Sequence, residues 1–259
     1  MGYLAGRESG ADLSMDASES GYSSVCDDFY VNARLDLRVK QAPDDRTVMD
    51  FFERMRRVAP SFTGVKKIDT EWILEAPLGD QRMEWVAVGP GAVRCGAVNP
   101  IRVSASYELA TNVLEALPGY FGINALDVVS LELTFGFDLD TDQDHYEAVH
   151  DTLLGGSRLA GLMRCDEERV VEMQPMLAWS LDHSADLQAQ VEVRPRGKGS
   201  GVGNVESCSV YSTVKRTGPV ERFEDPGVLV HELAGRVEAL ASDRVIPEIV
   251  MPLRARFLI

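Results

Sequence analysis

The chain has 259 residues, 45% hydrophobic and 26% charged, a composition typical of soluble globular proteins that excludes collagen-like and low-complexity classes. Its 41 acidic and 26 basic residues give a net charge of −15, which repels nucleic-acid phosphates and disfavours DNA or RNA binding. No stretch has the length of a membrane span or the pattern of a signal peptide, so we expect a cytoplasmic protein with reduced thiols and no membrane partner.

The first part of the chain is predicted to be a tail. Residues 1–26 are polar and rich in Gly, Ser and Asp, so they offer too little apolar surface to offset the entropy lost on ordering. We therefore expect a disordered tail over residues 1–26 and a single folded domain over residues 27–259.

The first half of this domain is predicted to begin with a strand over residues 31–39, where apolar and polar residues alternate. Residues 48–58 then place apolar side chains at intervals of three and four, which predicts an amphipathic helix that ends before Pro60. The remaining elements expected in this half are strands over residues 66–75, 82–88 and 92–98 and a helix over residues 104–117.

The second half shows the same order of patterns. Residues 129–137 alternate as in a half-buried strand, and residues 144–154 have helical spacing. The remaining elements expected in this half are strands over residues 170–181, 187–193 and 206–215 and a helix over residues 225–241.

The last segment, residues 244–259, contains two prolines that break any simple period. Leu253, Ala255 and Phe257 alternate with arginines, which suggests a terminal edge strand.

Each half thus reads strand, helix, three strands, helix, and we infer a duplication with halves near residues 27–120 and 125–259. The predicted fold class is α+β, with the duplicated units forming a largely antiparallel curved sheet that carries helices on one face, as in saddle and helix-grip architectures.

The layout from residue 27 onward, with the strand VVSLELTFGF in mid-chain and a strand-then-helix ending, resembles an uncharacterised, sporadically distributed bacterial protein family. The resemblance lies in the order of elements. No activity is known for that family, so the resemblance implies no site residues.

No metal or cofactor site is predicted. The acidic run from Asp138 to Asp144 lacks the glycine and the final glutamate that a calcium loop requires at its sixth and twelfth positions. We interpret it as the end of a strand followed by the acidic first turn of a helix. The four cysteines are dispersed without metal-ligand spacing.

No catalytic motif is present either. His145 and His150 share a predicted helix but differ by five positions, so they point to different faces. No histidine accompanies a G-x-S-x-G nucleophile elbow.

One basic, glycine-rich stretch carries Arg194, Arg196 and Lys198. A phosphate-binding loop requires a helix directly after it, whereas here a strand is predicted. A solvated hairpin loop is therefore the preferred interpretation, and a loop that orders around an anionic partner is the alternative.

Trp72 and Trp179 fall on comparable strands of the two halves, where tryptophan usually belongs to the core. The alternative is that they line an apolar cavity between sheet and helices, with an acidic residue such as Glu132 nearby.

The functional hypothesis is a non-enzymatic, cytoplasmic binding or protein-interaction module, whose partner is a protein or a small molecule; self-association is left open. The alternative is a small-molecule carrier or enzyme with a cavity between sheet and helices. A closed apolar pocket with convergent polar groups favours the second, and a filled core with an exposed patch favours the first.

Overall fold

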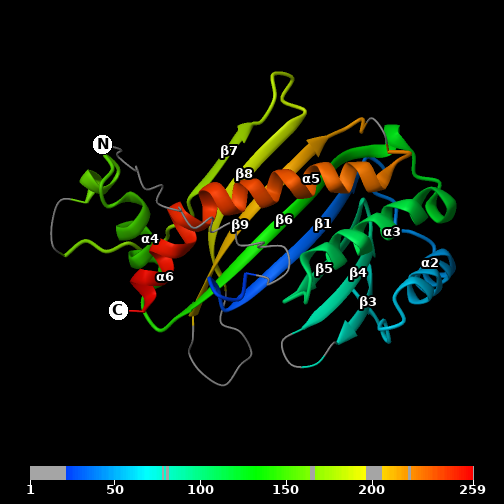
Figure 1. Cartoon of the computed structure of the whole chain (residues 1–259), viewed down its shortest axis with the longest axis horizontal. Coiled ribbons are helices and arrows are strands. Elements are labelled where there is room, and N and C mark those ends of the chain that lie inside the picture. The colour runs from blue at the N-terminus through cyan, green and yellow to red at the C-terminus, as the bar shows by residue number, and fades with distance from the viewer. Residues whose placement is uncertain are drawn as a thin grey trace, which may run out of the picture.

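One antiparallel sheet organises the computed structural model, which describes residues 22–258 apart from residues 78, 80–81, 164–166, 197–205 and 221–222. Its nine strands lie in the order β2-β3-β4-β5-β1-β6-β9-β8-β7 (Figure 1). The strands of the first half are β1 (Asp28–Leu37), β2 (Gly64–Ile68), β3 (Glu71–Pro77), β4 (Met83–Gly89) and β5 (Ala92–Val98). Those of the second half are β6 (Val128–Thr141), β7 (Met176–Ser180), β8 (Leu187–Arg196) and β9 (Glu206–Thr217).

Helices cover one face of this sheet, as the sequence predicts, so the α+β fold class is confirmed. They are α2 (Asp45–Val58), α3 (Val103–Phe121), α4 (His145–Leu154), α5 (Pro226–Leu240) and α6 (Met251–Phe257), with η1 (Ala125–Asp127) and η2 (Ala160–Leu162) as single 3₁₀ turns. None of the helices in the described part of the chain is long and apolar enough to cross a membrane.

Aspartates open three of the helices. The side chains of Asp44, Asp144 and Asp225 accept hydrogen bonds from backbone N–H groups in the first turns of α2, α4 and α5. These groups have no partner within a helix, so the caps define where each helix begins. The acidic run after Asp138 therefore ends in a helix cap, as its interpretation predicts.

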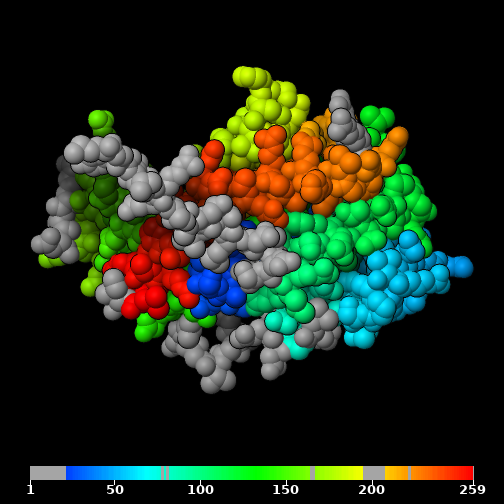
Figure 2. Space-filling view, in the orientation of Figure 1, coloured from blue at the N-terminus to red at the C-terminus, as the bar shows by residue number. Residues whose placement is uncertain are grey.

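The core lies between the sheet and the helices. Along β6 the alternate residues Leu131, Leu133, Phe135, Phe137 and Leu139 are at most 2% exposed, and they face the helices. Figure 2 shows α5 and α3 lying across this side of the molecule.

Tyr22 and Cys26 belong to this core, although the sequence placed them in the tail. The ring of Tyr22 lies 4.6 Å from that of Phe29 and 5.5 Å from that of Phe137, between centroids. Aromatic packing therefore begins at least as early as Tyr22, whereas residues 1–21 of the expected tail lie outside the described residues.

The two halves are arranged about the central β1–β6 pair. Outward from β1 lie β5, β4, β3 and β2, and outward from β6 lie β9, β8 and β7. The first half has one strand more than expected, because residues 66–75 form a hairpin rather than a single strand. Asp69 turns the chain at φ 53°, a left-handed conformation that aspartate tolerates better than most residues.

The chain is helical from Ala241 to Phe257, so the edge strand suggested by the alternation at Leu253, Ala255 and Phe257 is wrong. Residues Ala241–Val250 form η3, a π-helix that continues α5 directly into α6. Met251 N–H donates to Ile246 O, five residues back, and this wider turn accommodates Pro247 inside a helix. The buried residues include Val250, Leu253 and Phe257, which have helical spacing. The short alternation of apolar residues and arginines in this segment indicated a strand instead.

Candidate functional site

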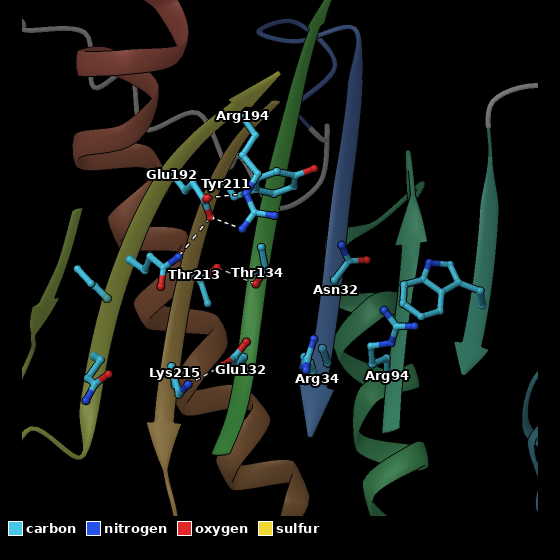
Figure 3. Close-up of a pocket in the computed structure, with 16 residues that line it drawn as sticks. Asn32, Arg34, Arg94, Glu132, Thr134, Glu192, Arg194, Tyr211, Thr213 and Lys215 are labelled. Carbon is cyan, nitrogen blue, oxygen red and sulfur yellow. Dashed lines mark hydrogen bonds and ion pairs between the residues drawn. The ribbon is translucent and has the colours of Figure 1, made fainter. Parts of the chain in front are cut away.

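The second face of the sheet carries the polar residues of the central strands. No helix of the described residues lies over this face, and in Figure 3 the helices stand behind the strands while the labelled side chains point forward. Antiparallel sheets commonly leave one face solvated, so an open face alone is not a site. The features below distinguish this face from a merely solvated one.

A hollow of about 370 Å³ lies at the centre of this face, and we call it the central hollow. It spans strands β4, β5, β1, β6, β9, β8 and β7, and most of its lining is polar. Its lining residues are Asn32, Ala33, Arg34, Trp85, Arg94, Glu132, Thr134, Ala178, Gln188, Ala189, Gln190, Glu192, Arg194, Tyr211, Thr213 and Lys215.

Two glycines lie against residues of its lining. A Cβ on Gly96 would lie 2.2 Å from Asn32 Oδ1 and 3.1 Å from the ring of Trp85. A Cβ on Gly136 would lie 3.1 Å from the ring of Tyr211. Because these positions have no side chain, the rings of Trp85 and Tyr211 can approach the backbone closely.

Two arginines stand directly opposite each other on neighbouring strands of the hollow. In the β1–β5 register Arg34 pairs with Arg94, and both side chains point out of the uncovered face (Figure 3). Like charges at directly opposed positions repel, so this pairing opposes stability unless other groups neutralise it.

Each of the two arginines forms an ion pair with a carboxylate. Arg94 contacts both carboxylate oxygens of Glu71 at 2.5 and 2.6 Å, and Arg34 bonds Asp36 at 2.8 Å. The hydrogen bond that Arg34 donates to Asp36 raises the pKa of Arg34 above its usual value, and the hydrogen bond that Arg194 donates to Glu192 does the same for the pKa of Arg194. Arg34 and Arg194 therefore stay charged.

Lys215 lies 3.0 Å from Glu132 and completes this row of charges. The side chains of Arg34, Arg94 and Lys215 are 49%, 38% and 36% exposed, so their ion pairs contribute only about 0–1 kcal/mol each. Their N–H groups are consequently available to a ligand at small cost.

Amide and hydroxyl groups occupy the middle of the hollow. Thr134 and Thr213 share a hydrogen bond of 2.8 Å across β6 and β9. Asn32 Oδ1 is buried and accepts no hydrogen bond from any described residue. A buried acceptor without a donor costs stability, so a donor supplied by a ligand would be favoured there.

The described lining of the central hollow contains no serine, cysteine or histidine. Burial raises the pKa of Cys95 and of Cys208 to about 12, so these thiols are unreactive at neutral pH. The described residues contain no cluster of His, Cys, Asp and Glu that could hold a metal ion.

The structure separates the site residues named from the sequence. Glu132 and Arg194 line the central hollow, whereas Trp72 and Trp179 lie on the helix side of β3 and β7, near opposite ends of the sheet. The three residues Trp72, Trp179 and Glu132 therefore share no cavity. Trp72 Nε1 donates to Asp45 of α2 at 2.9 Å, and Trp179 lines an apolar groove beside η3.

The basic stretch is described only in part. Arg194 bonds Glu192 on the uncovered face, and its guanidinium lies 5.9 Å from the ring of Tyr211. β8 ends at Arg196, whose side chain lies outside the described residues, as does Lys198. The anion-binding loop thus stays a prediction.

Sequence reasoning missed Arg34, Arg94 and Lys215. Each belongs to the polar phase of an alternating strand, where a charged residue signals solvent exposure and nothing more. Only the strand register brings them into one row.

Comparison with known proteins gives no family. No family model matches the chain, and no curated protein matches it. One solved structure with similarity is the crystal structure of the di-domain ARO/CYC BexL from the BE-7585A biosynthetic pathway, at 11% identity over 87% of this chain and 98% of that one. Its TM-score of 0.23 is too low to indicate a shared fold or function.

Proposed function

We propose that the chain is a non-enzymatic binding protein whose central hollow holds a ligand through a carboxylate or phosphate group. The opposed pair Arg34 and Arg94 is the observation that carries this proposal. An anion placed between two guanidinium groups relieves their repulsion and receives several charge-assisted hydrogen bonds.

The charge of the lining supports an anionic ligand. Four cations, Arg34, Arg94, Arg194 and Lys215, face two carboxylates, Glu132 and Glu192, on a chain whose net charge is −15. The neutralising partners Asp36 and Glu71 stand outside the lining. Local positive charge within an acidic surface concentrates anions at that point.

The unpartnered Asn32 Oδ1 adds a second requirement. A ligand hydroxyl or amide N–H would satisfy this buried acceptor once the Asn32 side chain turns toward the hollow, and the Trp85 and Tyr211 rings offer apolar contact there. Small organic acids, phosphorylated metabolites and peptide carboxyl ends share this chemistry.

The cavity between sheet and helices considered from the sequence has less support. Leu117 of α3 and Phe135 of β6 are completely buried there, and Leu133 is 2% exposed. This interface is therefore filled by side chains at the centre of the sheet.

Calorimetry with inorganic phosphate tests the proposal. We expect saturable binding to the wild-type protein and a loss of about tenfold or more in affinity for Arg94→Gln, because a bidentate donor is removed. Arg56→Gln is the control, because Arg56 is an exposed arginine of α2 paired with Glu53, away from the hollow. Equal binding by both variants, or no saturable binding by the wild type, would show that the charges only satisfy one another.

A further inference from the structure

The edge strand β7 differs from the strand at the opposite edge of the sheet. β2 carries Lys66 and Lys67, and charged residues of this kind protect an edge against pairing with other chains. β7 has the sequence Met-Leu-Ala-Trp-Ser and no charge at all. Met176 and Leu177 are 62% and 66% exposed.

The free edge of β7 presents backbone groups for pairing. Val193 N–H donates to Pro175 O, and Leu181 N–H donates to Leu187 O. In an antiparallel pair the inward-facing residues alternate, so Leu177 and Trp179 also face β8. The N–H and C=O groups of Met176, Ala178 and Ser180 consequently point away from the sheet.

The arrangement of the two halves shows what is missing beside β7. Outward from the central pair, the first half ends in β3 and then β2, whereas the second half ends in β7, the counterpart of β3. Among the described residues nothing pairs with β7 as β2 pairs with β3. A tenth strand beside β7 would complete the correspondence.

The helices that follow β1 and β6 are held by different contacts. In the first half Asp45 of α2 bonds Lys67 and Trp72, which ties α2 to the β2–β3 hairpin. Its counterpart α4 packs beside α6 instead, and Leu153 of α4 lines the same groove as Met176 and Leu177 of β7. In Figure 2 the yellow-green β7–β8 end rises past α5 at the margin of the molecule.

An apolar groove of about 220 Å³ follows β7 on the helix side. Leu177 and Trp179 form one wall, and Val245 and Ile249 of η3 form the other. A strand added to β7 would direct every second side chain into this groove, so backbone pairing and apolar contact would act together.

We propose that the β7 edge and its groove bind an extended segment of a partner protein, which adds to the sheet as a tenth strand and carries apolar residues alternating with lysine or arginine. β2 combines the same residue types, since Val65 packs on the core and Lys67, on the same face of the strand, lies 4.6 Å from the centroid of Trp72. The surroundings of β7 complement a basic segment, since the acidic residues Glu172, Asp182 and Glu248 are exposed near it and Arg244 is the one basic side chain lining the groove. The net charge of −15 attracts such a segment and repels a second copy of this chain.

A synthetic peptide of alternating lysine and valine, acetylated and amidated at its ends, serves as the probe. Ala178→Pro removes one outward N–H without touching a β7–β8 hydrogen bond, and Leu177→Lys places a charge on the edge. We expect the peptide to bind the wild-type chain. Both variants should lower the affinity for the peptide about tenfold or more. Ile101→Lys is the control, because Ile101 lies before α3 and is 69% exposed, similar to Leu177. Its affinity for the peptide should stay within about twofold of the wild type.

Hydrogen exchange identifies the place of binding. The amides of Ala178 and Ser180 should gain protection when the peptide is present, whereas those of β2 should not. Equal peptide binding by Ala178→Pro, or protection elsewhere, would overturn the proposal. A wild-type dimer that Ala178→Pro converts to a monomer would also overturn it, by assigning the edge to a second copy. Because Ala178 also lines the central hollow, phosphate binding by Ala178→Pro is measured in parallel, and Leu177→Lys, which lies outside that lining, separates the two sites.

Discussion

Gly96 packs directly against Asn32 and Trp85, two residues that line the central hollow. Its backbone lies so close to Asn32 and Val31 that an added Cβ would stand 2.2 Å from Asn32 Oδ1 and 2.7 Å from Val31 O. Backbone atoms cannot move aside as a flexible side chain can. The absence of a side chain at this position therefore sets the geometry of both Asn32 and Trp85.

Gly96→Ala should lower the free energy of unfolding by about 1–3 kcal/mol, the usual cost of overpacking. Gly119→Ala is the matched control, because a Cβ on Gly119 in α3 meets nothing within 4 Å. This control should be stabilised by up to about 1 kcal/mol, since alanine favours helix more than glycine does. Urea denaturation measures both, and equal effects of the two substitutions would contradict the close approach at Gly96.

The buried thiols make the free energy of unfolding depend on pH in the alkaline range. Burial raises the pKa of Cys95 and of Cys208 from 9.0 to about 12, so between these values the native chain holds protons that the unfolded chain releases. The stabilising contribution is complete below about pH 9 and is lost as the pH rises toward 12. Cys95→Ala should therefore show a shallower fall in the free energy of unfolding between pH 9 and 11 than the wild type. An unchanged slope would indicate that this thiol is not protected.

The residues of the candidate site could be recognised from the sequence only in part. From the sequence, Glu132 is expected beside a cavity between sheet and helices, whereas the structure places it on the opposite face of the sheet, in the central hollow. Arg34 and Arg94 lie on strands that were also predicted, but their direct opposition depends on the β1–β5 register. A single sequence with alternating strands does not fix which strands are neighbours.

At the level of elements, the three aspartate caps explain why several helix starts could be predicted. Asp44→Ala should lower the free energy of unfolding by about 1 kcal/mol, because the Thr47 N–H loses its acceptor at the start of α2. Asp50→Ala, at an exposed position within the same helix, should stay within about 0.5 kcal/mol of wild type. Thermal or urea unfolding distinguishes the two, and a larger effect of Asp50→Ala would show that the cap is not what stabilises α2.

The prediction of helices and strands was wrong where the local pattern of apolar and polar residues disagrees with the tertiary packing. The segment from Arg254 to Phe257 alternates like a strand, but Leu253 and Phe257 are four residues apart and both are buried, which is helical spacing. The β2–β3 hairpin was missed because its turn at Asp69 contains no glycine or proline. Both errors arise from short segments in which two periods fit equally well.

For the whole molecule, the central β1–β6 pair joins the halves. Phe29 of β1 lies 5.2 Å from Phe135 and 5.4 Å from Phe137 of β6, between ring centroids. On the helix layer Tyr107 of α3 donates to Glu238 of α5 at 2.7 Å. Separation of the halves would expose a long strand edge and these apolar rings to water.

Residues 1–122 and 123–259, expressed separately, should therefore each give poorly dispersed NMR spectra. Mixing the two fragments should restore dispersion, because each supplies the strand and helix faces that the other lacks. Well-dispersed spectra from both separate fragments would show that each half folds independently, and would contradict one continuous core.

The central claim, an anion site between Arg34 and Arg94, is tested most directly by NMR of the arginine side-chain Nε–Hε groups during a phosphate titration. The account predicts that the Nε–Hε signals of Arg34 and Arg94 shift together and saturate, while that of Arg56 in α2 hardly moves. Shifts of Arg34 and Arg94 no larger than that of Arg56, without saturation, would contradict it.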